Sequence, residues 1–289
     1  MTPVSSSHTT TQAIRDEMGA VLADSGDVID SNHEIAAAFV VARRDALALP
    51  DYPGTLPADL VQAYRIQDHA IALDGRTIAG WKVGRVMPPD DVRLGSNRLA
   101  GPIFADTITM AANPVMPIYA GGFSAAEAEF LLHVAPGPSG TLPRNDAETK
   151  ALIDDVRIGI EIASSPYPGI NSHDAAVTAS DFGNNAGLVA GAALAGWREL
   201  DLCAIPVRTE IDGKVVGEKT AAAMLDGPYG AVRFLLANLT ARGIDVSGGI
   251  WVSSGAVTGV HSVSVGQTVV VHFGDHGSVA CSISAAAAR

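Results

Sequence analysis

One segment alternates acidic with apolar residues and reads Ala126-Glu127-Ala128-Glu129-Phe130-Leu131-Leu132. Successive side chains of a strand point to opposite faces, so Glu127 and Glu129 would share one face and their apolar neighbours the other. Two like charges side by side on an apolar strand need water or a cation to compensate them. The pattern therefore predicts a strand whose acidic face is either an exposed strand edge or a metal site.

Similar short β-prone runs follow one another from Thr77 onward, separated by Gly, Pro, Asn and Asp. They lie at 78–86, 103–108, 126–134, 156–164, 207–211, 215–216, 250–254 and 268–273. The Asp212-Gly213 step predicts a hairpin turn, and helices are expected at 145–154 and at 228–242, before Gly243. This spacing is typical of a mostly β domain with many turns.

Two helical patterns precede the β-rich part. Asn32 can cap the first helix, which would end before Pro50, and the second would run from near Pro57 to the turn at Asp74-Gly75. We therefore expect an α+β protein with a disordered polar tail at 1–30, a helical N-terminal region at 31–76 and a β-rich catalytic domain at 77–285.

Composition narrows the class of protein. The 289 residues are 47% hydrophobic and carry a net charge of −12, which argues against nucleic-acid binding. The longest apolar stretch, at 186–197, is too short to span a bilayer, and we see no secretory signal. Cys203 and Cys281 lack metal-type spacing and are expected to be buried thiols of a cytoplasmic protein.

Two further features belong with the paired glutamates. Glu161 interrupts an apolar β-prone run, where it would be a metal ligand or an ion-pair partner of Arg157, four positions earlier on the same face. Three carboxylates from two strands would suit Mg²⁺ or Mn²⁺. Lys82 stands between Gly80 and Gly84, which favours either an exposed charge or a ligand that approaches the backbone closely.

Together these motifs resemble the fumarylacetoacetate hydrolase superfamily over about residues 33–283. Within it, the chain is most similar to the 2-hydroxypenta-2,4-dienoate (2-keto-4-pentenoate) hydratases and their sister 4-oxalocrotonate decarboxylases. The resemblance implies a β-rich mixed barrel or roll core preceded by N-terminal helices. It is carried by Gly80-Trp81-Lys82-Val83-Gly84, Glu127 and Glu129, Ile160-Glu161-Ile162, and Ser254-Gly255-Ala256-Val257-Thr258-Gly259.

The resemblance also implies roles for individual residues. Glu127, Glu129 and Glu161 would hold Mg²⁺ or Mn²⁺. Lys82 would bind substrate or transfer a proton, and Asp106 would be a catalytic acid near the substrate. Thr258, Asp181 and Ser254 match motif positions that contact the substrate. His133, and His173 with Asp174, are weaker candidates for the surroundings of the site.

Hydration of a 2-hydroxy-dienoate or 2-oxo-enoate through a metal-stabilised enolate is the leading expectation. The alternatives are decarboxylation of a 4-oxalocrotonate-type 2-oxo acid, hydrolysis of a C–C bond in an acylpyruvate, and a non-catalytic accessory subunit or binder. His33-Glu34 would lie in the N-terminal region, but adjacent helical residues do not share a face, so they do not form a water-activating pair. The resemblance further implies a homo-oligomer associated with a sister enzyme.

Departures from the hydratase pattern leave the substrate unnamed. Ala163-Ser164-Ser165-Pro166 stands where hydratases carry Asp-Ser-Arg after the third glutamate, Asn184-Asn185 replaces a serine pair, and Gly248-Gly249 replaces Gly-Asp. The metal motif is intact, whereas the elements that face the substrate differ.

Overall fold

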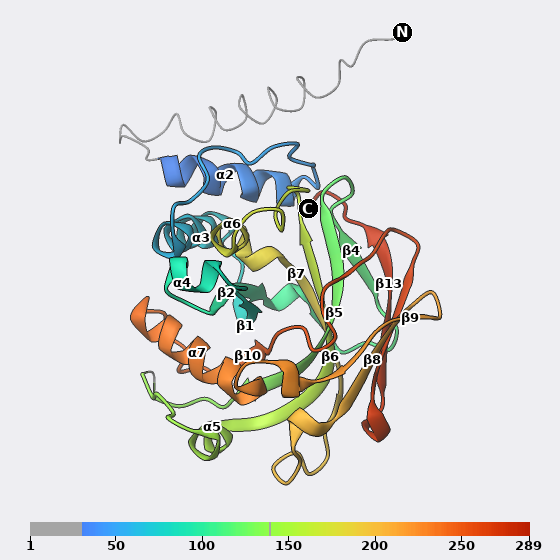
Figure 1. Ribbon diagram of the computed structural model, residues 1–289. Coiled ribbons are helices and arrows are strands. Elements are labelled where there is room, and N and C mark those ends of the chain that lie inside the picture. Colours follow the sequence, from blue (N-terminus) through green and yellow to red (C-terminus); the bar gives the residue numbers. More distant parts are fainter. Residues whose placement is uncertain (1–30, 139) are drawn as a thin grey trace.

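The computed structural model describes residues 31–138 and 140–289 (Figure 1), so the tail expected at 1–30 lies outside the described residues. Helices α2 (Ser31–Arg44) and α3 (Leu60–Asp74) confirm the two N-terminal helical patterns. The Asp59 side chain caps α3 by accepting from the Gln62 amide, and Gly75 ends it with φ 69°. Asn32 lies inside α2, so its expected role as a cap is wrong.

An eight-stranded mixed sheet follows, in the order β2-β1-β10-β5-β6-β7-β3, with β11 pairing with β5. The long antiparallel pair β5 and β6 forms its centre (Figure 1). The strands are β1 (Ile78–Arg85), β2 (Arg98–Phe104), β3 (Ile108–Thr109), β5 (Phe123–Val134), β6 (Ile153–Ser165), β7 (Asn185–Ala193), β10 (Ile250–Ser253) and β11 (His261–Ser262).

A five-stranded sheet completes the β structure, in the order β4-β13-β12-β8-β9. The predicted hairpin joins β8 to β9, and Asp212 and Gly213 both have positive φ, 49° and 73°, as a turn of this kind requires. The strands are β4 (Val115–Ile118), β8 (Pro206–Ile211), β9 (Lys214–Thr220), β12 (Thr268–Phe273) and β13 (Ser278–Ala285).

Helices and short turns occupy the connections. Helices α2, α3 and α6 lie close together at one side of the large sheet, and α7 packs elsewhere on that sheet (Figure 1). The remaining helices are α4 (Asp90–Leu94), α5 (Asp146–Leu152), α6 (Ala175–Ser180) and α7 (Gly227–Ala241). The 3-10 turns are η1 (Ala105–Thr107), η2 (Phe182–Asn184), η3 (Leu202–Ala204), η4 (Ala221–Ala223) and η5 (Gly274–His276).

The two faces of the large sheet are chemically different, as the alternation in β5 predicts. Ala128 and Phe130 belong to the main core cluster, which also contains residues of the small sheet and α7. The rings of Phe130 and Phe273 meet there edge to face at 5.2 Å. Glu127 and Glu129 point to the opposite face. An α+β fold with curled, barrel-like sheets is thus confirmed.

Several elements differ from expectation. Strand β2 spans Arg98–Phe104 rather than 103–108, and β7 and β13 were not predicted. Strand β7 reads NAGLVAGAA, which is rich in glycine and alanine and poor in the β-branched and aromatic residues that are typical of strands. Cys281 is buried and Cys203 only half-buried, and both are free thiols. No described helix is both long and apolar enough to cross a membrane.

Candidate metal centre

Three glutamates meet on the second face of the large sheet. Glu127 of β5 lies directly opposite Glu161 of β6 in the strand register, and Glu129 follows on the same face of β5. One carboxylate oxygen from each lies within 4.8 Å of the others. All three side chains are buried, which rules out the exposed strand edge that the sequence left open. The fold therefore brings the three predicted ligands together at one point. That they bind a metal remains a prediction.

Each of the two most deeply buried carboxylates has one oxygen held and one free. Oε2 of Glu129 accepts from Ser253 Oγ at 2.5 Å and from the Gly255 amide at 2.8 Å, and Oε1 of Glu161 accepts from Asn185 Nδ2 at 2.9 Å. The other oxygens, Glu129 Oε1 and Glu161 Oε2, have no hydrogen-bond partner among the described residues. Buried carboxylate oxygens without donors are costly, and hard divalent cations prefer such ligands. The donor set therefore fits Mg²⁺ or Mn²⁺.

Lys82 is the cation of this cluster. Its side chain is buried, and Nζ lies 3.2 Å from Glu161 Oε1 and 3.4 Å from Asn184 Oδ1. Burial lowers the pKa of Lys82, but the charges of the three glutamates raise it by more, so the ammonium stays charged. An exposed lysine, the ordinary expectation, is wrong here.

The Lys82–Glu161 pair also reports the shape of the sheet. Two strands, β10 and β5, lie between β1 and β6. In a flat sheet, three strand spacings would separate β1 and β6 by about 14 Å. A contact of 3.2 Å between side chains of these strands requires the sheet to curl around the site. The sequence also allowed Arg157 as the ion-pair partner of Glu161. That alternative is wrong, because Arg157 instead pairs with Asp155 at 2.7 Å.

The glutamates hold protons more tightly than ordinary carboxyl groups. Burial is the main cause that raises the pKa of Glu127, to about 7, and the charge of Glu161 adds to it although Lys82 opposes it. Burial, followed by the charges of Glu161 and Glu127, raises the pKa of Glu129 well above its usual value. Without a metal, the site therefore retains protons near neutral pH.

We expect the stabilisation by metal to grow with pH. The metal-free folded protein binds more protons than the unfolded chain, so its stability should fall as pH rises through about 7. Bound metal needs ionised carboxylates and removes this loss. The difference in Tm between Mg²⁺-loaded and chelated protein should be larger at pH 8 than at pH 6. Scanning fluorimetry at both pH values measures it, and an equal difference would contradict the protonated site.

A pocket of about 520 Å³ opens over the cluster, and Lys82, Glu127, Asn184 and Ser254 line it. Ser254 Oγ is buried there without a hydrogen-bond partner among the described residues, so it can donate to a bound ligand. The pocket is also lined by Arg85, Arg98, Lys219, Asn171, His173 and Asp174.

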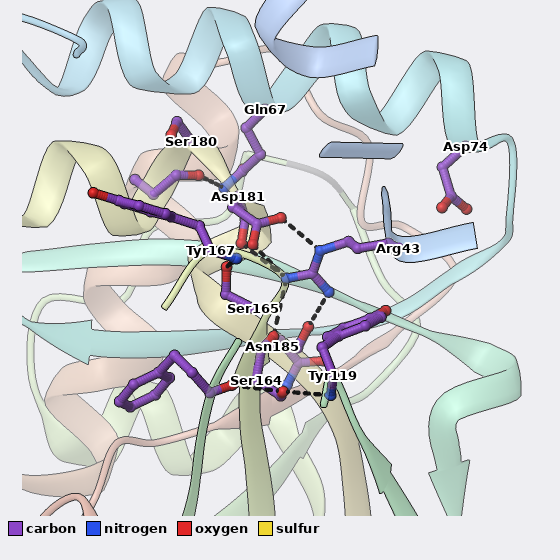
Figure 2. A network of polar contacts seen from close by, with 12 residues as sticks. Arg43, Gln67, Asp74, Tyr119, Ser164, Ser165, Tyr167, Ser180, Asp181 and Asn185 are labelled. Atoms are coloured by element: carbon purple, nitrogen blue, oxygen red, sulfur yellow. Dashed lines mark hydrogen bonds and ion pairs between the residues drawn. The ribbon is translucent and has the colours of Figure 1, made fainter. Parts of the chain in front are cut away.

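Three of the expected substrate contacts lie elsewhere. Asp106 is exposed on η1, beyond the end of β2, where it pairs with Arg76 at 3.3 Å. Asp181 is buried in an ion pair with Arg43 (Figure 2). The Thr258 hydroxyl contacts Thr209 Oγ1 at 2.8 Å and His261 Nε2 at 3.0 Å. None of the three expected residues lines the pocket.

The expected histidines divide in the same way. His173 and Asp174 line the pocket, and the His173 ring is bonded to the Tyr167 hydroxyl at 2.8 Å. His133 does not line the pocket; its Nδ1 is 2.6 Å from Asp154 and its ring packs on Trp251. Neither His33 nor Glu34 lines the pocket.

Four residues that hold the site were not foreseen as such: Arg43, Ser253, Asn184 and Asn185. Ser253 directly precedes the Ser-Gly motif, and that adjacency was the available signal. The two asparagines were visible only as departures from the hydratase pattern. Arg43 carried no signal, because its partners are 121 to 142 residues away in the chain.

Comparisons with known proteins show which proteins this chain resembles. No family model matches the chain. It is 27% identical to 4-oxalocrotonate decarboxylase of Pseudomonas putida over 129 residues, 45% of this chain and 48% of that protein. The match therefore spans about half of that relative.

Solved structures share the fold over a greater length. 4-Oxalocrotonate decarboxylase from Pseudomonas putida G7, complexed with magnesium and adipate, has a TM-score of 0.74 at 21% identity, covering 89% of this chain and 100% of that one. Fumarylpyruvate hydrolase from Pseudomonas aeruginosa, with Mn²⁺ and pyruvate, has a TM-score of 0.54 at 12% identity, covering 73% and 91%. These likenesses show that the chain shares the fold of these two enzymes, as the resemblance implied.

Proposed function

We propose that this chain, which has the fold of the fumarylacetoacetate hydrolase superfamily, is a divalent-metal-dependent enzyme that forms the enolate of a small 2-oxo acid. Glu127, Glu129 and Glu161 would hold Mg²⁺ or Mn²⁺. The observation that carries the proposal is the buried trio of carboxylates at a pocket, with one oxygen on each of Glu129 and Glu161 lacking a partner. A small chelating acid supplies the oxygen ligands that such a site still lacks.

When bound, the metal supplies Lewis acidity, which stabilises negative charge that develops on the 2-oxo oxygen. Lys82 lines the same pocket as a charged ammonium, so it can bind an anionic group of the substrate. Because its pKa is raised, proton donation is the weaker of its two predicted roles. Ser254 Oγ can donate a hydrogen bond to the substrate and so orient it. The backbone amide of Gly255 donates a hydrogen bond to Glu129 Oε2 and so fixes the position of that carboxylate.

Decarboxylation of an unsaturated dicarboxylic 2-oxo acid of the 4-oxalocrotonate type is the first candidate reaction. A carboxylate would leave as CO₂, its bonding electron pair would enter the conjugated enolate, and a proton would later return to carbon. The likeness to 4-oxalocrotonate decarboxylase supports this choice. Arg85 and Lys219 on the pocket lining add positive charge that suits a second carboxylate in an otherwise acidic protein.

Hydration of a 2-hydroxy-dienoate, the reaction first expected from the sequence, is the second candidate. It needs a group that can exchange a proton with water. His173 lines the pocket, and its hydrogen bond to Tyr167 orients the ring. The acylpyruvate hydrolase alternative lacks this support, because the His33-Glu34 pair does not line the pocket. The homo-oligomer and its association with a sister enzyme remain predictions, as do the domain boundaries.

Two assays separate the candidates. The purified chain with Mg²⁺ or Mn²⁺ is given 4-oxalocrotonate in one and 2-hydroxypenta-2,4-dienoate in the other. We expect CO₂ release in the first. Loss of the dienol absorbance in the second without CO₂ release in the first would establish the hydratase instead. Turnover of either substrate that survives exhaustive chelation would overturn the metal-dependent function altogether.

The Arg85→Ala variant should bind a dicarboxylic substrate more weakly. An exposed ion pair contributes about 0.2–1 kcal/mol, which corresponds to an increase in KM of about 1.4- to fivefold. kcat should change little, because the described partners of the three glutamates do not include Arg85. A 2-oxo acid without a second carboxylate is the internal control, and an equal rise in its KM would contradict the assignment.

A further inference from the structure

A short buried turn connects α6 to β7 beside the metal centre. Its residues Phe182, Gly183 and Asn184 all have positive φ, 53°, 62° and 56°. Such a backbone is unfavourable for phenylalanine and asparagine, so surrounding contacts must hold it in place. The turn also packs tightly on β2, since a Cβ added at Gly101 would lie 2.1 Å from the Phe182 carbonyl oxygen.

One arginine from the N-terminal helix α2 binds both ends of this turn (Figure 2). At the first end, Arg43 Nε and Nη2 donate to the two carboxylate oxygens of Asp181 at 2.5 and 2.9 Å. At the other end, Nη1 donates to the Asn185 carbonyl at 2.8 Å. Nη2 also reaches the Ser164 carbonyl of β6 at 3.2 Å. The Arg43 and Asp181 side chains are only 2% and 0% exposed, so these bonds form away from solvent.

This turn also contacts two charged groups of the site, Lys82 and Glu161. Asn184 Oδ1 accepts from Lys82 Nζ at 3.4 Å, and Asn185 Nδ2 donates to Glu161 Oε1 at 2.9 Å. Because Oε1 of Glu161 is occupied in this way, Oε2 is the oxygen left without a partner. Gly183 completes the contact, since a Cβ there would lie 3.0 Å from Lys82 Cδ.

We propose that Arg43 and Asp181 are a positioning pair for the metal centre. They touch neither the pocket nor the three glutamates, and they act through Asn184 and Asn185, which orient Lys82 and Glu161. The inference rests on the proposed function, because it assumes that Glu161 is a metal ligand. It also replaces the role first expected for Asp181, which was a direct contact with substrate.

Metal binding without substrate tests the pair. Mn²⁺ is titrated into the full chain by calorimetry, and each variant is also unfolded thermally. Replacing a residue that orients a metal ligand typically weakens metal binding by about 10- to 100-fold. Asn185→Ala removes the bond to Glu161 and should weaken Mn²⁺ binding about tenfold. Arg43→Lys cannot reproduce the forked contacts to Asp181, Asn185 and Ser164, so it should weaken binding in the same direction.

Arg242→Lys is the matched control. Arg242 is also largely buried and donates to Gln67 Oε1 at 2.9 Å, joining α7 to α3. Its loss should lower Tm and leave Mn²⁺ affinity unchanged. If Arg43→Lys does not fold, the Arg43→Met/Asp181→Leu double variant takes its place, because it leaves no unpaired buried charge.

The outcomes separate the two levels of the proposal. A wild-type chain that binds Mn²⁺, together with an Arg43 variant that binds within twofold of it, would overturn only the positioning pair. A lower Tm in that variant would then reflect packing alone. A wild-type chain that does not bind Mn²⁺ would overturn the proposed function and the positioning pair with it.

Discussion

The Glu127→Gln variant is expected to lose both metal binding and turnover. Glutamine keeps the size of the side chain but presents one weaker oxygen ligand and no charge. Removing a group that stabilises transition-state charge costs about 10²- to 10³-fold in kcat, and loss of the metal should cost at least that much. Calorimetric titration with Mn²⁺ and the decarboxylation assay measure the two effects.

Glu148→Gln is the control for this variant, because Glu148 is a surface glutamate bonded to Arg144 at 2.6 Å and lies outside the pocket. It should retain full metal affinity and activity. Activity that survives in Glu127→Gln under strong chelation would refute the metal centre. If no activity can be measured for the wild-type chain, and Glu127→Gln keeps an accessory role, the protein is instead the non-catalytic binder.

Replacing Lys82 with Met should separate metal binding from catalysis. The substitution keeps an unbranched side chain in the space beside Gly183 but removes the ammonium, so kcat should fall by about 10²- to 10³-fold, as for loss of a group that stabilises negative charge in the transition state. Mn²⁺ affinity should be retained or increase, because a positive charge 3.2 Å from Glu161 Oε1 is gone.

The matched control is Lys214→Met, which alters an exposed lysine at the start of β9. It should change neither quantity. If Lys82→Met bound Mn²⁺ much more weakly than wild type while kcat at saturating metal stayed normal, Lys82 would be a structural partner of Glu161 and would take no part in the chemistry.

Local patterns predicted those parts of the fold that local physics determines. The alternation around Glu127 and Glu129 placed them on one face, and the same period put Ala128 and Phe130 in the core. The Asp212-Gly213 step specified a hairpin because few residues accept positive φ. The order of the motifs then predicted that Glu161 joins Glu127 and Glu129, although its distance from them in the sequence gives no geometric information by itself.

Contacts between distant segments were not predictable in this way. Asp106 matched a motif by position, but the 3-10 turn after β2 carries it to the surface. Asp181 and Thr258 also matched by position, and their side chains are used by Arg43 and by Thr209 and His261. Burial of Lys82 depends on how far the sheet curls, a property of all its strands together.

The ion pair between Lys82 and Glu161 has a consequence for how the protein is made. A newly synthesised chain that encloses three carboxylates must balance their charge before any ion arrives. The ammonium of Lys82 and the protons retained by Glu127 and Glu129 perform that task from within the chain. We therefore expect the chain to fold before it binds the metal. Activity should then be recoverable simply by adding the ion to intact, previously stripped protein.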